Sequence, residues 1–282
     1  MSTQVLRALL EAVDLAVYSY IKPAAPHRYS LKFKDLHSIV ASITTSLRTY
    51  LKAMDEGYEV ASGRYGFTEV SIGTLIKDAI QENAYAMRGQ SNPLMHMVLI
   101  PASMAASYTL KLKNFLATDA YLNAFKSIIM NANPQETHKV YDALRNSPND
   151  LRRAVELSGL TPGRIVVENI TLDEFIRILS KHHKHLELIS LKHNLIVEAS
   201  NTFLKKYTDT GDLNLATVVT YKYIAEAFHD IKFTPELRSR EDFKKLLELD
   251  SELHSKGVDL SFVIPYLTEA VFISLLSLYS KR

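Results

Sequence analysis

The feature that most restricts the fold of this sequence is a helical spacing of apolar residues along most of the chain. Apolar side chains three and four positions apart lie on one face of an α-helix, because a helical turn contains about 3.6 residues. The spacing is clearest in residues 5–20, 36–51 and 72–87. We therefore expect an all-α protein.

Capping signals add further helices to this expectation. A capping side chain followed by proline, which is tolerated in the first helical turn, marks a helix start. The sequence has three such pairs, Asn92-Pro93, Asn133-Pro134 and Thr234-Pro235. Thr171 and Glu174 have the spacing of a capping box. These signals predict helices that begin near residues 93, 134, 172 and 235. The apolar spacing predicts others at 117–130, 149–158, 184–207, 213–229 and 259–280.

Two segments lack this helical pattern. Pro162-Gly163 is a turn signal, and a short β-branched run follows it, so we expect residues 160–170 to form a loop. Residues 55–67 are polar and contain three glycines, which predicts an irregular and mobile loop. Neither segment is a long polar linker. We therefore expect residues 1–282 to form a single all-helical, bundle-like domain of about ten helices.

The composition excludes several classes of protein. The absence of cysteine excludes disulfides, thiolate zinc sites and a cysteine nucleophile. A net charge of +2 argues against a surface that binds nucleic acid. The most apolar segment, 258–279, contains Asp259, Pro265 and Glu269, which favours a core helix over a membrane span. We expect a cytoplasmic protein that has no secretory signal and no contact with membranes.

The first candidate binding segment lies between two predicted helices. Arg88, Gly89 and Asn92 lead directly into the helix predicted at residue 93. Free N–H groups and the helix dipole at such a terminus favour phosphate, and glycine lets the backbone approach it. The alternative is an ordinary capped loop, which these residues alone favour.

The second candidate segment, residues 22–28, follows the first predicted helix. Two prolines stiffen it, and Lys22, His27 and Arg28 offer donors that suit phosphate. The alternative is a loop that ends a helix, with basic residues placed favourably near the negative end of the dipole.

Histidines concentrate at residues 182–193. On a helix, His182 and His185 would share a face, and so would His183 and Glu187, which could together bind a metal. The interleaved lysines disfavour a cation there, so we expect a solvated helix face and no metal site. The chain contains no Walker-type phosphate loop and no Gly-x-Ser-x-Gly elbow.

The two candidate segments resemble motifs of the triphosphoribosyl-dephospho-CoA synthase family, particularly its archaeal-type members. The family motif Pro-Lys-Pro-Gly, followed by His-Arg, is similar to Ile-Lys-Pro-Ala-Ala-Pro-His-Arg at 21–28. The motif Asn-Thr-x-Leu-Gly, which opens an apolar helix, is similar to residues 91–95 and the apolar residues 97–106. Residues 33–42 and 171–207 also lie where the family has helices. The resemblance covers about two thirds of the chain.

This resemblance implies an all-helical pentosyl-type transferase that joins the triphosphoribosyl group of ATP to a dephospho-CoA-like nucleotide and releases adenine. It implies that Lys22, His27 and Arg28 neutralise the triphosphate and that Asn92 orients a phosphate or ribose. It also implies Mg²⁺ bound with ATP, and Asp14 and Asp35 are candidate carboxylates for a metal or a base role.

Three positions depart from the family pattern. Ala16 stands where the family has a glutamate, and Ala24 and Met95 stand where it has glycines. The alternative is therefore a non-catalytic member of the same fold that binds a nucleotide or a protein partner. A metal-binding protein that uses the histidines is a third hypothesis. The sequence leaves the oligomeric state open, a homo-oligomer included.

Overall fold

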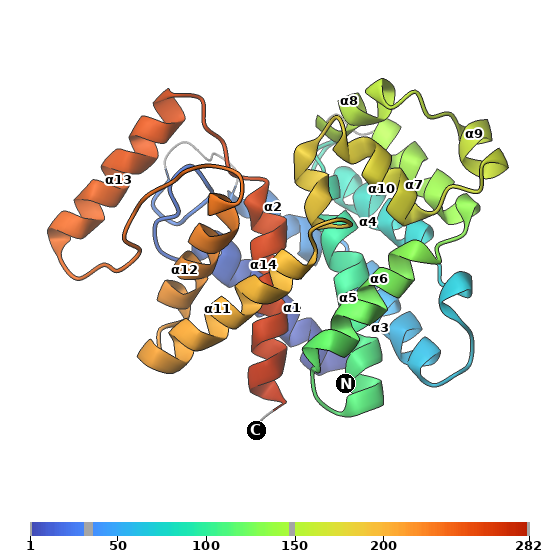
Figure 1. Ribbon diagram of the computed structural model, residues 1–282, viewed down its shortest axis with the longest axis horizontal. Coiled ribbons are helices and arrows are strands. Elements are labelled where there is room, and N and C mark those ends of the chain that lie inside the picture. The colour runs from blue at the N-terminus through green and yellow to red at the C-terminus, as the bar shows by residue number, and fades with distance from the viewer. Residues whose placement is uncertain (1, 31–35, 147–149, 281–282) are drawn as a thin grey trace.

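The computed structural model describes residues 2–30, 36–146 and 150–280. Within these ranges the chain forms fourteen α-helices, two short 3₁₀-helices and no strand (Figure 1). This confirms the predicted all-α class. The fourteen α-helices outnumber the predicted value of about ten, because the predicted helix 36–51 is divided into α2 and α3 and short helices such as α9 form.

The helices of the N-terminal half are α1 (Ser2–Tyr18), α2 (Leu36–Thr44), α3 (Leu47–Ala61), α4 (Ile72–Ala86), α5 (Pro93–Lys113), α6 (Thr118–Met130) and α7 (Pro134–Asn146). Those of the C-terminal half are α8 (Asp150–Leu157), α9 (Pro162–Val167), α10 (Leu172–Ser180), α11 (Asn194–Thr210), α12 (Leu213–Glu226), α13 (Arg240–Ser255) and α14 (Val263–Tyr279). The 3₁₀-helices are η1 (Phe67–Glu69) and η2 (Lys184–Leu188).

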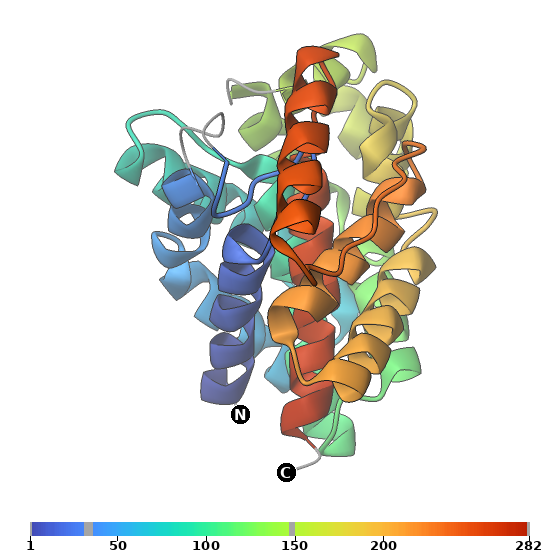
Figure 2. The same ribbon diagram turned by 90° about the vertical axis from the view of Figure 1, so that its left-hand side faces the viewer.

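Helices α5 and α14 form the centre of the molecule and contact each other (Figures 1 and 2). Helix α14 also packs on α1, α11 and α12, and α5 on α3, α4 and α6. The side chains of α14 are buried without interruption from Val263 to Leu276, so the most apolar segment is a core helix, as predicted. No helix in the described ranges is long and apolar enough to cross a bilayer.

The segment 55–67 is only in part the irregular loop that the sequence predicts. Helix α3 continues to Ala61, whereas residues 62–66 form turns and bends before η1 begins at Phe67. Gly57 lies on this helix against α5, where an added Cβ would stand 2.2 Å from the carbonyl oxygen of Met104. Gly73 on α4 is equally close to α7, with a Cβ position 1.9 Å from the Glu136 oxygen. These glycines therefore permit close helix packing.

The predicted helix 36–51 is divided between α2 and α3. The Ser46 hydroxyl donates to the Ala79 carbonyl of α4 at 2.9 Å, and the Thr45 hydroxyl donates to Ala41 at 2.6 Å. Such bonds from hydroxyl side chains to carbonyls compete with helix continuation.

The predicted helix 184–207 is also wrong in its first part, which consists of η2 and turns before α11 begins at Asn194. The Tyr266 hydroxyl of α14 donates to the His185 carbonyl at 2.7 Å, and the His193 ring nitrogen Nδ1 lies 3.1 Å from the Leu188 carbonyl. Bonds to other parts of the chain thus replace the helical ladder here.

The loop predicted at 160–170 contains the short helix α9. The Thr161 side chain accepts a bond from the Arg164 amide at 3.2 Å, so it caps a helix that opens with Pro162. The helix predicted from residue 235 instead begins at Arg240. Ser239 caps it by accepting from the Asp242 amide at 3.1 Å. The starts predicted near 93, 134 and 172 are confirmed.

Candidate functional site

The 22–28 loop leaves the end of α1 and is buried from Ile21 to His27, whereas Arg28 is exposed. Ala24, at the position of the family's motif glycine, has a left-handed backbone with φ 64°. This conformation costs an alanine roughly 1 kcal/mol or more, whereas glycine adopts it freely. The loop therefore has, at Ala24, a backbone conformation that glycine favours.

Contacts from the C-terminal third hold this backbone in place. The Ala24 amide donates to Asp250 Oδ1 of α13 at 2.9 Å, and the Leu260 amide donates to the Ala24 carbonyl at 2.8 Å. The Tyr221 hydroxyl of α12 donates to the Pro23 carbonyl. Both polar groups of Ala24 are thus satisfied, which supports the strained conformation.

Lys22 is a fully buried amine within this loop. It donates one hydrogen bond, to the Ser19 hydroxyl at 2.8 Å, and forms no ion pair in the described part of the chain. Burial holds the pKa of Lys22 well below 10.5, and the neighbouring charge of Arg28 lowers it further. An ammonium has three donors, so Lys22 has capacity for an additional acceptor.

His27 and Asp250 form the second polar pair of the loop. His27 Nδ1 accepts from the Tyr29 amide at 3.2 Å, so a neutral ring carries its proton on Nε2, which lies 3.6 Å from Asp250 Oδ2. Burial lowers the pKa of His27, although Asp250 opposes this shift. Burial would raise the pKa of Asp250, but His27 and the Ala24 amide outweigh it and lower the pKa overall.

Arg28 lies at the surface, where α1 meets α12. Its Nε–H donates to the Tyr18 carbonyl at the end of α1, and a terminal nitrogen donates to Asn214 Oδ1 at 3.2 Å. These contacts use two of the five N–H groups of the guanidinium, so the others can reach an anion.

The 88–93 turn joins α4 to α5. Arg88 is exposed, with φ 53°, and Gly89 has φ 94°. The Asn92 side chain accepts from the Met95 amide at 3.3 Å, which makes it the N-cap of α5. The backbone N–H of Asn92 in turn donates to Asn83 Oδ1 at 3.1 Å. The turn therefore has the geometry of an ordinary capped loop, which was the alternative to a phosphate site in this segment. Arg88 is the exposed cation of this turn.

The two predicted segments are not joined by any hydrogen bond or ion pair among the described residues. They extend from α1 and α4, and α2 contacts both of these helices. A shared site built from Lys22, His27, Arg28, Arg88 and Asn92 thus stays a prediction.

The three residues that depart from the family pattern, Ala16, Ala24 and Met95, are all buried. Ala16 and Met95 are completely buried in the apolar core, so neither position faces solvent. Asp14, one candidate metal ligand, is exposed on α1. Asp35, the other, lies outside the described residues.

The histidine cluster does not form the helix face that the sequence predicts. His182 lies in a turn and His183 directly precedes η2, and the ring of His185 stacks on Phe262 at 3.3 Å between centroids. Burial, followed by the charge of His183, lowers the pKa of His185 to about 4. The described part of the chain contains no group of three or more acidic or histidine side chains arranged to hold a metal.

A buried polar network joins α6, α14 and the turn before α11, and the sequence pattern does not indicate it. Glu269 of α14 accepts from the Tyr121 hydroxyl at 2.6 Å and lies 3.1 Å from His193 Nε2. The Phe125 ring stacks on His193 at 3.8 Å. All four side chains are shielded from solvent, so we assign this network to the fold.

Asp250 and Tyr221 are also missing from the residues that the sequence identifies. Each lies in a helix of ordinary composition, far along the chain from the loop that it holds. Their partners are backbone groups of Ala24 and Pro23, and residue types alone do not predict such pairings.

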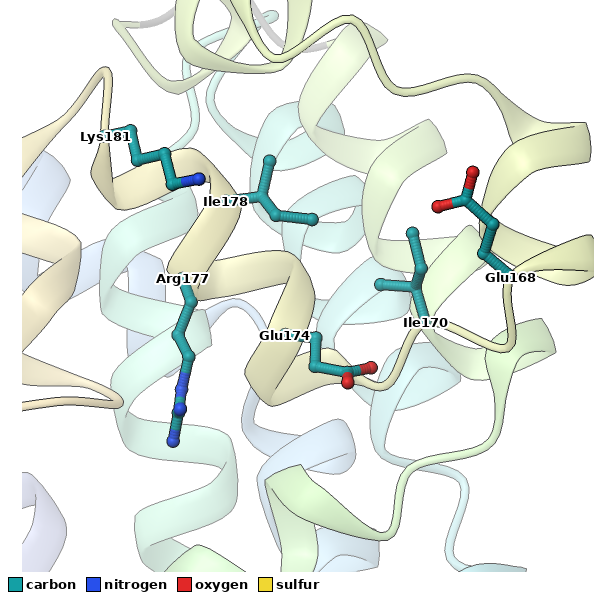
Figure 3. A pocket seen from close by; sticks show the side chains of 6 residues that line it. All are labelled: Glu168, Ile170, Glu174, Arg177, Ile178 and Lys181. Atoms are coloured by element: carbon teal, nitrogen blue, oxygen red, sulfur yellow. The ribbon is translucent and has the colours of Figure 1, made fainter.

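A hollow of about 340 Å³ lies on another part of the surface, along α10 and the end of α9 (Figure 3). The side chains around it are Glu168, Ile170, Glu174, Arg177, Ile178 and Lys181. Helices α9 and α10 lie on the right of Figure 1, on the other side of the α5–α14 pair from α13 and the loop that follows α1. Arg177 is already paired with Asp173 at 2.8 Å.

Comparisons with known proteins connect this geometry to one fold. Neither protein-family models nor curated proteins gave a match. Among solved structures, the chain is similar to a crystal structure from Archaeoglobus fulgidus that is provisionally described as triphosphoribosyl-dephospho-CoA synthase. The TM-score is 0.56 at 17% identity, over 84% of this chain and 98% of that one. The two proteins share a fold.

Proposed function

We propose that this protein is a divergent transferase of the triphosphoribosyl-dephospho-CoA synthase type, with ATP as donor and a CoA-like nucleotide as acceptor. The observation that carries this proposal is the 22–28 loop. It combines a buried lysine, which has no counter-ion among the described residues, with a left-handed residue at the position that resembles the motif glycine. The fold is shared with a protein described as such a synthase.

In this reaction a ribose hydroxyl of the acceptor attacks the anomeric carbon of the ribose of ATP. A new C–O bond forms, the bond between that carbon and adenine breaks, and adenine takes the bonding electron pair. The hydroxyl proton is released, and adenine gains a proton. The triphosphate remains attached to the transferred ribose, so the protein has to hold about four negative charges during the transfer.

The 22–28 loop can supply many of the donors that balance the negative charge of the triphosphate. Arg28 has exposed N–H groups, and Lys22 has donors that its bond to Ser19 leaves unused. Neutral His27 presents an N–H at Nε2 while its Nδ1 lone pair is occupied by the Tyr29 amide. His27 therefore acts as a donor to an anion in this arrangement, and a general base has to come from elsewhere. Arg88 and Asn92 belong to the second part of the proposed site.

The described residues do not form a ready site for Mg²⁺. Ala16 is apolar and buried, Asp14 is exposed on α1, and Asp250 is bound to the loop. No group of three or more acidic or histidine side chains in the described ranges could hold a metal. Mg²⁺ commonly binds through substrate phosphates with few protein carboxylates. We derive no step of the transfer from a metal.

The alternative is a non-catalytic member of the fold that binds a nucleotide. Two observations favour it. The family's glutamate position is occupied by Ala16 in the core, and the amine of Lys22 and the ring of His27 are covered. Binding without transfer is therefore the second candidate function.

Thermal unfolding with MgATP and dephospho-CoA tests binding, because a ligand that binds only the folded state raises Tm. We expect a rise with MgATP in the wild type and in Lys205→Ala, whose lysine is exposed on α11. We expect no rise in Lys22→Ala, and a smaller one in Asn92→Ala. If neither nucleotide at millimolar concentration changes the Tm of the wild type, the protein is not a nucleotide-binding protein of this type.

Release of adenine separates the two candidate functions. Incubation with MgATP and dephospho-CoA, followed by chromatography, is expected to yield adenine and the triphosphoribosylated acceptor in equal amounts. Binding of both nucleotides without adenine would instead establish the non-catalytic alternative.

A further inference from the structure

Asp250 reaches from α13 into the polar part of the 22–28 loop. Only Leu246 and Asp250 of this helix are buried, and its flanking segments 227–239 and 256–262 are largely irregular. In Figure 1 the helix lies at the outer edge of the molecule, beside the loop that follows α1. In the first turn of α13, the Phe243 ring contacts Tyr29, the residue after the loop, edge-on at 5.0 Å.

The carboxylate of Asp250 occupies a position that suits an external anion. One oxygen accepts from the Ala24 amide at 2.9 Å, and the other lies 3.6 Å from the Nε2 atom of His27. Backbone amides in tight turns and imidazole N–H groups bind carboxylates and phosphates alike, because both present charged oxygen acceptors. Asp250 is 6% exposed, so its carboxylate prevents access to these donors.

Lys22 provides an independent indication that the loop is built for an anion. It is completely buried, and it retains donor capacity without any ion pair in the described ranges. Burying an amine in this way is unfavourable unless another interaction compensates for it. Asp250 pairs with His27 and with His254 of its own helix, whose Nδ1 lies 3.2 Å from Oδ1, and not with Lys22. The remaining donors of Lys22 are therefore not used by this carboxylate.

We propose that Asp250 is an internal substitute for a ligand phosphate, so that polyphosphate enters the 22–28 loop only when α13 withdraws this carboxylate. The inference rests on the proposed function, in which the loop binds the triphosphate of a nucleotide. Asp250 then reduces the apparent affinity, because only the fraction of molecules with the carboxylate withdrawn can bind.

A solely structural role of Asp250 predicts a different result. If the contact only fastens α13, its loss lowers the stability of the fold and leaves the affinity for polyphosphate unchanged or weaker. If the carboxylate competes with the ligand, its loss lowers stability and strengthens binding. Affinity therefore distinguishes the two roles, whereas stability does not.

Titration calorimetry with inorganic triphosphate tests this competition in the full-length protein. Asp250→Ala is expected to bind at least about tenfold more tightly than the wild type. Asp250→Asn keeps an oxygen for the Ala24 amide and is expected to give a smaller gain. Glu248→Ala removes an exposed carboxylate two positions away on α13 and is expected to match the wild type.

Hydrogen exchange of the wild type gives a second readout, which does not depend on the folding of a variant. Saturating triphosphate is expected to speed amide exchange in residues 240–255, because the bound ligand displaces the anchor of α13. Unchanged exchange in α13, with triphosphate bound, overturns the proposal.

The outcomes separate this inference from the proposed function. If the wild type binds triphosphate through Lys22 and Asp250→Ala gains no affinity, Asp250 is not a substitute for phosphate and the proposed function stands. If none of the four proteins binds triphosphate, the loop is not a polyphosphate site, and both proposals are wrong.

Discussion

At the scale of single residues, Lys22 combines an unfavourable environment with a suitable position for binding. Its amine is fully buried, bonded to Ser19 and without a counter-ion in the described ranges. Residues that reduce stability in this way are often retained because a ligand uses them. Replacing Lys22 by an apolar residue should therefore raise the stability of the fold and weaken the binding of a ligand.

We expect Lys22→Met to raise the free energy of unfolding by about 1–3 kcal/mol at neutral pH, because methionine fills a similar volume without a buried amine. The folded-state pKa of Lys22 lies below 10.5. The unfolded chain therefore binds more protons between these pKa values, and the stability of the wild type rises with pH across this window. The advantage of the variant should shrink towards pH 10.5, as measured by denaturant unfolding at several pH values. A variant less stable than the wild type at every pH contradicts this.

A second residue-scale prediction concerns His96, which is buried on α5 with its Nδ1 3.1 Å from the Tyr50 hydroxyl. Burial lowers the pKa of His96 from 6.5 to about 3. The unfolded chain therefore takes up a proton first, and stability falls as the pH drops from 6.5 towards 3, by up to about 3 kcal/mol at pH 4. His96→Gln lacks the titrating group and should weaken this dependence in urea titrations. An equally steep dependence in the variant excludes His96 as the cause.

At the scale of elements, apolar spacing and capping chemistry predict most helices. The capped starts of α5, α7 and α10 follow from local side chains, because Asn and Thr bond to the nearby amides that a helix leaves free. The failures have causes outside the local sequence. Glycine is typical of loops, but Gly57 lies inside α3, at a point where α5 comes so close that no side chain would fit. The start of the predicted helix 184–207 is replaced by bonds to α14.

Close helix packing gives an element-scale prediction. We expect Gly73→Ala to destabilise the protein by about 3 kcal/mol or more, because the new methyl group would overlap the Glu136 backbone of α7. Gly163→Ala is the matched control. It lies in α9 with nothing within 4 Å of the added Cβ, and we expect it to raise stability by about 0.5–1 kcal/mol. Denaturant unfolding measures both changes. Similar effects of the two substitutions would show that α4 and α7 can separate without cost.

At the scale of the whole molecule, the candidate site joins segments from the two ends of the chain. The 22–28 loop follows the first helix, whereas Tyr221, Asp250 and Leu260, which hold it, belong to the last third. The sequence identifies the basic residues of the loop because proline, lysine, histidine and arginine cluster there. It does not identify their partners, because these bonds go to backbone groups, which every residue possesses.

The central claim is that the 22–28 loop binds the triphosphate of a nucleotide. Hydrogen exchange with and without saturating MgATP tests it most directly, because bound phosphates protect the amides that contact them. We predict slower exchange at residues 21–29, with a smaller effect at 88–95. Bound MgATP that leaves these amides unchanged, or protects instead the hollow along α10 in Figure 3, would contradict the claim.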